Sequence, residues 1–141
     1  MIMKKTLIIA TILLLAPNTL IAKSKYFQEG LNLFKNNKLD DAKFKFEQDI
    51  VLNPKNELSY LYLSKIFNKK DNTNLEEQNL NTVILLNPTN EEAVYNLAKL
   101  KLSSSDYKKS KELNKKLKAI CKNFCNQSEK LKIEIENSSK K

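Results

Sequence analysis

Cys121 and Cys125 are the two residues of this chain whose type and spacing are best suited to chemistry. Two cysteines provide at most half of a tetrahedral zinc site, and a thioredoxin-like redox pair has two intervening residues where this chain has three. Within one continuous helix the two thiols would point poorly for a bond, but a break near residues 122–124 would let a disulfide join two segments. We therefore expect a structural disulfide, with free buried thiols and a catalytic pair as the alternatives.

The rest of the sequence offers little to catalysis. There is no histidine, which is the commonest general base and metal ligand, and a single glycine leaves no glycine-rich phosphate loop. We find no serine nucleophile motif and no pair of carboxylates in an evident cleft. The sequence therefore predicts no enzymatic activity, no catalytic or metal-ligating residues and no cofactor.

The chain is basic, with a formal net charge of +9, and all 25 basic residues are lysines. Such a charge could attract nucleic acid or an anionic membrane. Arginine, however, is the residue that binds phosphates and base edges bidentately, and a nucleic-acid-binding protein without it would be unusual. We interpret the lysine content as a compositional bias of the whole chain and expect no nucleic-acid partner.

The first 22 residues have the pattern of a secretory signal peptide. Lys4 and Lys5 precede an uncharged run at 6–16 that is mostly leucine and isoleucine, and Ala22 lies at the expected cleavage site. This run is shorter than the roughly 20 residues that span a bilayer, although an uncleaved membrane anchor is the alternative. We therefore expect an exported protein, periplasmic or secreted, in a compartment that favours disulfides.

A repeat of 34 residues organises the chain after this leader. Two Asn-Pro pairs end at Pro54 and Pro88, which are 34 positions apart, and each follows a short apolar run. Proline cannot continue a helix and disfavours helical geometry in the residue before it, so each pair predicts a helix end. The same spacing aligns the small residues Gly30, Ser64 and Ala98.

The repeat predicts paired helices at about 24–36, 40–52, 56–69, 73–86, 90–103 and 106–122. Thr73 with Glu76 and Thr89 with Glu92 form the capping-box pattern at two of the starts. About three such hairpins are needed to bury a continuous core, and the last one needs a cover. Residues 126–137 are the expected cover. Charged and apolar residues alternate strictly at 130–136, which is typical of a strand. A strand without a partner would leave its backbone groups unpaired, so we favour a helix there.

These residues resemble the tetratricopeptide repeat (TPR) family. The first unit matches the family pattern of aromatic, small, small, aromatic and closing proline with Tyr26, Gly30, Ala42, Phe46 and Pro54, whereas Asp49, Glu76 and Asn114 depart from it. The resemblance implies an all-α, right-handed superhelical stack of three TPR-like hairpins plus a C-terminal capping segment. The repeat domain would span 23–137, with units at about 23–56, 57–90 and 91–122, the cap at 126–137 and a disordered tail at 138–141. With its leader, the chain is similar to an exported bacterial TPR-domain protein.

The resemblance also implies a ligand groove on the concave face, which the first helix of each hairpin lines. The expected groove residues are Phe27, Leu31, Phe34, Leu61, Lys65, Asn68, Tyr95, Lys99 and Leu102. An apolar end followed by lysines would suit a peptide with an apolar anchor and some acidic side chains. The alternative is that Phe27, Leu31 and Phe34 are core residues. Some TPR proteins bind the terminal carboxylate of a partner with a clamp of polar side chains. Phe27 and Leu31 stand where such polar groups would be needed, so we do not expect a carboxylate clamp.

A basic patch is the other candidate surface. It comprises Lys108, Lys109, Lys111, Lys115, Lys116 and Lys118, and it could contact anionic lipid, envelope polymer or an acidic protein, or be a solvated helix face. The sequence thus predicts a non-enzymatic scaffold or adaptor of the envelope or periplasm that binds another protein or peptide. The alternative function is binding of an anionic envelope surface through the lysine-rich C-terminal region. An uncovered end of the stack would also allow self-association.

Overall fold

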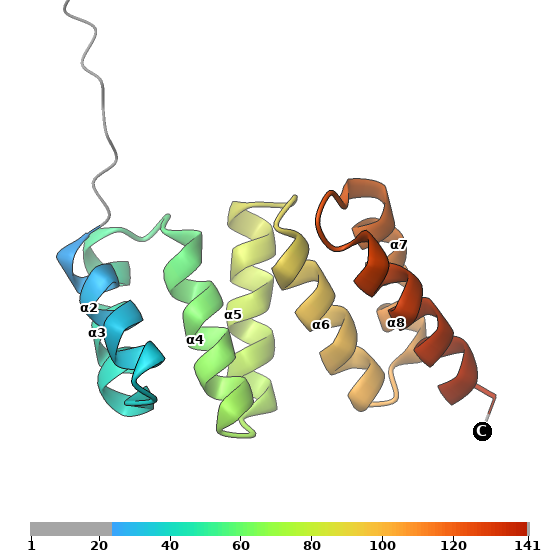
Figure 1. Ribbon diagram of the computed structural model, residues 1–141, viewed down its shortest axis with the longest axis horizontal. Helices are drawn as coiled ribbons and strands as arrows, with labels where there is room; N and C mark the ends of the chain where they lie inside the picture. The colour runs from blue at the N-terminus through green and yellow to red at the C-terminus, as the bar shows by residue number, and fades with distance from the viewer. Residues whose placement is uncertain (1–23, 141) are drawn as a thin grey trace, which may run out of the picture.

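The computed structural model describes residues 24–140, and every regular element in this range is an α-helix (Figure 1). The helices are α2 (Lys25–Lys35), α3 (Leu39–Leu52), α4 (Glu57–Lys69), α5 (Thr73–Leu86), α6 (Glu91–Ser103), α7 (Tyr107–Ile120) and α8 (Cys125–Ser138). In Figure 1 the chain runs along the long axis from α2 and α3 at the left, through α4, α5 and α6, to α7 and α8 at the right. The signal peptide expected at 1–22 and residue 141 of the expected tail lie outside the described residues. Over the described range, no helix is both long and apolar enough to cross a bilayer.

Consecutive helices form three hairpins, α2–α3, α4–α5 and α6–α7, and α8 packs against the last of them. The expected stack of hairpins with a C-terminal cap is therefore confirmed. The strand alternative for residues 130–136 is wrong, because they lie within α8. Leu131 and Ile135, which are buried, lie one helical turn apart, so the segment covers the third hairpin with a helical face.

Each hairpin turns through one residue with a left-handed backbone, namely Asn37 (φ 56°), Asp71 (φ 55°) and Ser105 (φ 63°). In the first turn the N–H of Lys38 donates to the carbonyl of Leu33 at 2.9 Å, which closes the helix with a Schellman-type cap. Asparagine and aspartate adopt this conformation more readily than other residues with a side chain. The turns therefore recur at the 34-residue spacing without any glycine.

Two helix starts are capped by asparagine and not by the expected threonines. The side chain of Asn72 accepts a hydrogen bond from the N–H of Leu75 at 3.1 Å, and Asn90 accepts one from the N–H of Ala93 at 3.0 Å. The capping boxes predicted to start at Thr73 and Thr89 are therefore wrong. Asparagine is a better N-cap than threonine, so the asparagine next to each threonine takes the capping position.

Small residues let the two helices of a hairpin approach closely. A Cβ atom at Gly30 would lie 2.8 Å from Cε1 of Phe46, which is closer than such atoms approach. Ser110 serves the same purpose in the third hairpin, where its buried hydroxyl donates to the carbonyl of Ala98 at 2.8 Å. Around these contacts the apolar core forms two clusters, one centred on α2, α3 and α4 and one extending from α4 to α8.

Asp49 ties the first hairpin to the second. It is fully buried and accepts hydrogen bonds from the side chains of Ser24, Asn53, Asn56 and Ser59. Because Ser24 caps α2 and Ser59 lies in the first turn of α4, one carboxylate joins three helices. Burial alone would raise the pKa of Asp49, but the four hydrogen bonds together hold it below its usual value. The buried carboxylate is therefore a specific junction between hairpins.

A disulfide and a carboxylate fix the loop between α7 and α8. Cys121 follows the end of α7 and Cys125 begins α8; their Cα atoms are 5.3 Å apart and the two residues are bonded. The helix breaks between the two cysteines, as the expected disulfide required. Glu91 of α6 accepts hydrogen bonds in this loop from the N–H groups of Asn123 at 2.9 Å and Phe124 at 2.8 Å. The cap is thus attached to the third hairpin by covalent and polar contacts.

Candidate functional site

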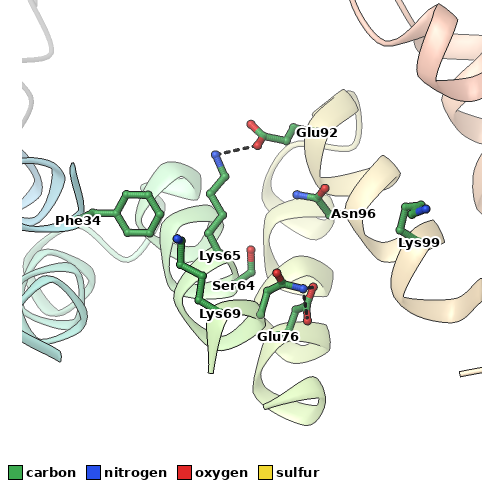
Figure 2. Close-up of a pocket in the computed structure, with 9 residues that line it drawn as sticks. Phe34, Ser64, Lys65, Lys69, Glu76, Glu92, Asn96 and Lys99 are labelled. Atoms are coloured by element: carbon green, nitrogen blue, oxygen red, sulfur yellow. Dashed lines mark hydrogen bonds and ion pairs between the residues drawn. The ribbon is translucent and has the colours of Figure 1, made fainter. Parts of the chain in front are cut away.

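A pocket of about 300 Å³ lies between α2, α4, α5 and α6, and we call it the central pocket (Figure 2). It is lined by Phe34 of α2, by Ser64, Lys65, Asn68 and Lys69 of α4, by Glu76 of α5, and by Glu92, Asn96 and Lys99 of α6. These residues come from all three hairpins. The pocket therefore exists only in the assembled stack.

An ion pair bridges the pocket from α4 to α6, and the Phe34 ring of α2, backed by the Tyr62 ring of α4, forms an aromatic wall. Lys65 Nζ lies 2.7 Å from Glu92 Oε1 and 4.7 Å from the centre of the Tyr62 ring. The Tyr62 ring meets the Phe34 ring edge-on, with centroids 5.3 Å apart. Lys69 Nζ lies 5.9 Å from the centre of the Phe34 ring, within the range of a cation–π contact. This side of the pocket can therefore contact both apolar and acidic groups.

Glu76 is a buried carboxylate among the residues that line the pocket. The residue is 5% exposed, and its two carboxylate oxygens accept hydrogen bonds from Asn68 Nδ2 at 3.1 and 3.2 Å, which Figure 2 draws as dashed lines. Burial raises the pKa of Glu76, and the hydrogen bonds from Asn68 oppose this effect without cancelling it. The pocket thus combines lysines at its edge with a carboxylate at its base.

Four of the expected groove residues, Phe34, Lys65, Asn68 and Lys99, line the central pocket. Leu31, Tyr95 and Leu102 pack against the two core clusters and are partly exposed. Phe27 and Leu61 are only 1% and 4% exposed, so they belong to the core and offer no side chain to the groove. The rings of Phe46 and Tyr62 cover Phe27, so this residue has the core position that was the alternative to a groove position.

Five lining residues were not expected from the sequence: Ser64, Lys69, Glu76, Glu92 and Asn96. Lys69 follows Lys65 by one helical turn and Asn96 precedes Lys99 by one turn, so helical spacing could have indicated both. Glu76 comes from the second helix of its hairpin, which was not expected to face the groove. Its only signal in the sequence is a carboxylate where the other repeats have a small residue.

The expected basic patch lies along α7. Lys108, Lys109, Lys111, Lys115 and Lys118 are exposed and Lys116 is partly buried. Lys109 pairs with Glu112 at 3.2 Å, and Lys118 pairs with Glu129 of α8 at 2.6 Å. No residue of the patch lines the central pocket, so the two candidate surfaces can be altered independently.

Within residues 24–140 no group of three or more His, Cys, Asp or Glu side chains could hold a metal ion. Cys121 and Cys125 are bonded to each other, in agreement with the disulfide expected from the sequence, so neither is a free thiol. Among the described residues we take the central pocket as the candidate site for a ligand.

Several solved structures are similar to this chain. SycD, a type III secretion chaperone of Yersinia enterocolitica in complex with a peptide of the translocator YopD, is 14% identical with a TM-score of 0.72, covering 82% of this chain and 90% of that chain. The TPR2B domain of yeast Sti1 in a complex with pHsp70 is 14% identical with a TM-score of 0.73, covering 81% and 98%. The first TPR domain of Spaghetti (RPAP3) bound to an HSP90 peptide is 15% identical with a TM-score of 0.67, covering 76% and 87%. The fold is that of tetratricopeptide repeat domains.

No protein-family model matches the chain, and no curated protein matches it. At identities of 14–15% the similarity to TPR domains shows the fold alone. Within this TPR fold, α2, α4 and α6 are the first helices of the three repeats, and they supply eight of the nine residues of the central pocket. The pocket is therefore lined mainly by the helices that were expected to line the groove.

Proposed function

We propose that the protein is a non-enzymatic scaffold or adaptor that binds a peptide or helix of another protein in the central pocket and the groove around it. The observation that carries this proposal is the pocket, in which three hairpins bring lysine and asparagine side chains next to an aromatic wall. Polar groups of this kind can fix the register of a peptide while the aromatic wall buries one of its apolar side chains. None of the lining residues is a histidine or a cysteine.

Peptide complexes of similar structures support the proposal. SycD is in complex with a peptide of YopD, and the first TPR domain of Spaghetti is bound to an HSP90 peptide. A chain of this fold can therefore bind a peptide of another protein. By analogy, the partner of the present chain is a protein or peptide and not a small metabolite.

We further propose that the protein is exported and acts in the periplasm or outside the cell. The signal-peptide pattern of residues 1–22 supports this location, and a disulfide in the folded domain fits an oxidising compartment. N-terminal sequencing of the protein recovered from its native envelope tests the location. A mature chain that begins near Lys23 is expected, whereas a retained leader in the membrane fraction would indicate an anchored protein.

Charge reversal at two lysines tests the binding site. Lys99 lines the central pocket, whereas Lys115 lies on α7 outside it, and each change to glutamate alters the net charge by the same amount. After a partner is identified by crosslinking in the native envelope, its affinity is measured for the wild type and for both variants. We expect Lys99→Glu to weaken binding about tenfold or more and Lys115→Glu to leave it unchanged. Equal effects of the two substitutions would contradict binding in the pocket.

Binding of an anionic envelope surface is a second candidate function. It is favoured by Lys108, Lys111 and Lys115, which are exposed at helical spacing on α7 and form no ion pair within the described residues. Sedimentation with anionic lipid vesicles at low and high salt tests it, because salt screens exposed charges. This function predicts binding that is lost with salt and with Lys115→Glu and is kept by Lys99→Glu. No binding to the vesicles at low salt would rule out a lipid surface.

A further inference from the structure

Glu76 replaces a small residue of the repeat. At the same position of the other two hairpins, Ala42 and Ser110 are fully buried in the contact between paired helices. A glutamate side chain is too long for that contact. It extends to the base of the central pocket, where the residue is 5% exposed and where Figure 2 shows it beside the lining residues of α4.

Two lysines of the pocket already have acidic partners. Lys65 of α4 pairs with Glu92 at 2.7 Å, and Lys99 of α6 pairs with Glu134 of α8 at 2.6 Å. Both lysines therefore point their charges toward neighbouring helices. Neither of them neutralises Glu76.

Glu76 receives hydrogen bonds only from the neutral amide of Asn68, and among the described residues no cation pairs with it. A carboxylate offers about four acceptor sites and two of them accept here, so about half of its capacity is unused. A charged group buried without an opposite charge is unfavourable, because it has lost its hydration. Lys69 is also without a carboxylate partner in the described part of the chain and contacts the Phe34 ring. The pocket therefore has one anionic and one cationic position open to a ligand.

We propose that Glu76 receives a basic side chain, lysine or arginine, of the bound peptide, and that Lys69 receives an acidic residue close to it in the same peptide. This inference rests on the proposed function and narrows the class of partner to segments with neighbouring opposite charges. The pocket volume of about 300 Å³ accommodates a long side chain. The carboxylates of the pocket, Glu76 and Glu92, belong to no group of three or more acidic, histidine or cysteine side chains within the described residues that could hold a metal ion. A hydrogen bond between two charged groups is also stronger in such a shielded site than on the surface.

A random peptide library displayed on phage tests the inference when it is selected in parallel on the wild type, Glu76→Gln and Glu77→Gln. Glu77 is the matched control, because it neighbours Glu76 on α5, pairs with Lys101 at 2.5 Å and does not line the pocket. Glu76→Ala is a second variant, in which the position has a small residue as in the other two repeats. It serves if the buried amide of Glu76→Gln prevents folding. Thermal unfolding shows whether each variant is folded.

We expect peptides selected on the wild type and on Glu77→Gln to be enriched in lysine or arginine next to aspartate or glutamate. Their affinity should fall about tenfold or more on Glu76→Gln and on Glu76→Ala. Replacement of the basic residue by norleucine should weaken binding to the wild type to a similar extent and should hardly affect binding to Glu76→Gln.

Two kinds of failure are distinguishable. Peptides that need Lys99 but contain no enriched basic residue, or that bind Glu76→Gln as tightly as the wild type, would overturn this inference and leave the proposed function intact. Selected peptides that bind Lys99→Glu normally, or a selection that enriches no peptide, would contradict both.

Discussion

Asn114 of α7 and Ser128 of α8 form a reciprocal pair of hydrogen bonds that docks the last helix onto the stack. Asn114 Nδ2 donates to the carbonyl of Ser128 at 3.0 Å, and Ser128 Oγ donates to Asn114 Oδ1 at 2.9 Å. Both residues are buried. At the corresponding position the first hairpin has Phe46, so the last repeat has a polar contact with its cap where the first has an aromatic core residue.

Removal of one partner of this pair should destabilise the protein. Ser128→Ala leaves the buried Asn114 Oδ1 without a donor, which we expect to lower the free energy of unfolding by about 1–3 kcal/mol. Addition of Asn114→Leu removes the unsatisfied group and should restore part of the loss. Urea unfolding measures both effects, with the exposed Ser139→Ala as a control expected to stay within about 0.5 kcal/mol. A Ser128→Ala variant as stable as the wild type would show that the pair does not hold the cap.

Gly30→Ala should also destabilise the protein, although alanine favours helices. The new Cβ would meet the buried Phe46 ring at 2.8 Å, and such overpacking costs about 1–3 kcal/mol, against a gain of about 1 kcal/mol in helix propensity. We expect a net loss of up to about 2 kcal/mol in urea unfolding. On a Phe46→Leu background, where the ring is absent, the same substitution should become neutral or stabilising. A stabilising effect in the wild-type background would contradict the close contact.

The hydrogen bonds to Asp49 predict a loss of stability in acid. Because the pKa of Asp49 is lower in the folded state than its usual 3.8, the unfolded state binds more protons between these values. The contribution of Asp49 to stability is therefore fully present above about pH 4, and it is lost as the pH falls through the pKa of Asp49 in the folded state. The free energy of unfolding of the wild type should fall more steeply below pH 4 than that of Asp49→Asn. The Asp49→Asn variant should already be less stable than the wild type at neutral pH. Asp41→Asn, at an exposed position of the same helix, is the control and should follow the wild-type curve. Parallel curves for Asp49→Asn and the wild type would refute this role.

Reduction of the disulfide should loosen the cap while the hairpins stay folded. For so short a loop, the chain-entropy model gives a loss of about 2 kcal/mol. Glu91 still holds the loop backbone, so we expect faster hydrogen exchange chiefly in α8 after reduction or in a Cys121→Ser/Cys125→Ser variant. Reductant should have no effect on the double variant. Unchanged exchange in α8 of the reduced wild type would show that the disulfide does not stabilise the cap.

The sequence predicted the helix ends well where proline and repeat spacing determine them. Pro54 and Pro88 follow the last residues of α3 and α5, Leu52 and Leu86, by two positions each. Such boundaries depend on local backbone sterics, which a sequence displays directly. The helix at residues 130–136 was predicted because a strand there would have no partner strand.

The depth of the groove side chains could not be predicted in the same way. Phe27 and Tyr95 share a repeat position, yet Phe27 is core because aromatic rings from α3 and α4 surround it, whereas Tyr95 stays partly exposed beside Phe124. The position of Glu76 at the base of the pocket likewise depends on contacts between several helices. Repeat spacing indicates which face a residue occupies, but neighbours distant in sequence decide how far it is buried.

Chemical-shift mapping tests most directly the central claim that a partner segment occupies the central pocket. Nitrogen-15-labelled protein is titrated with the segment of the crosslinked partner that retains binding. We predict that the largest shifts concentrate at the backbone amides of Lys65, Asn68, Asn96 and Lys99, with little change along α7. Shifts concentrated on the lysines of α7, with the pocket amides unmoved, would contradict the account.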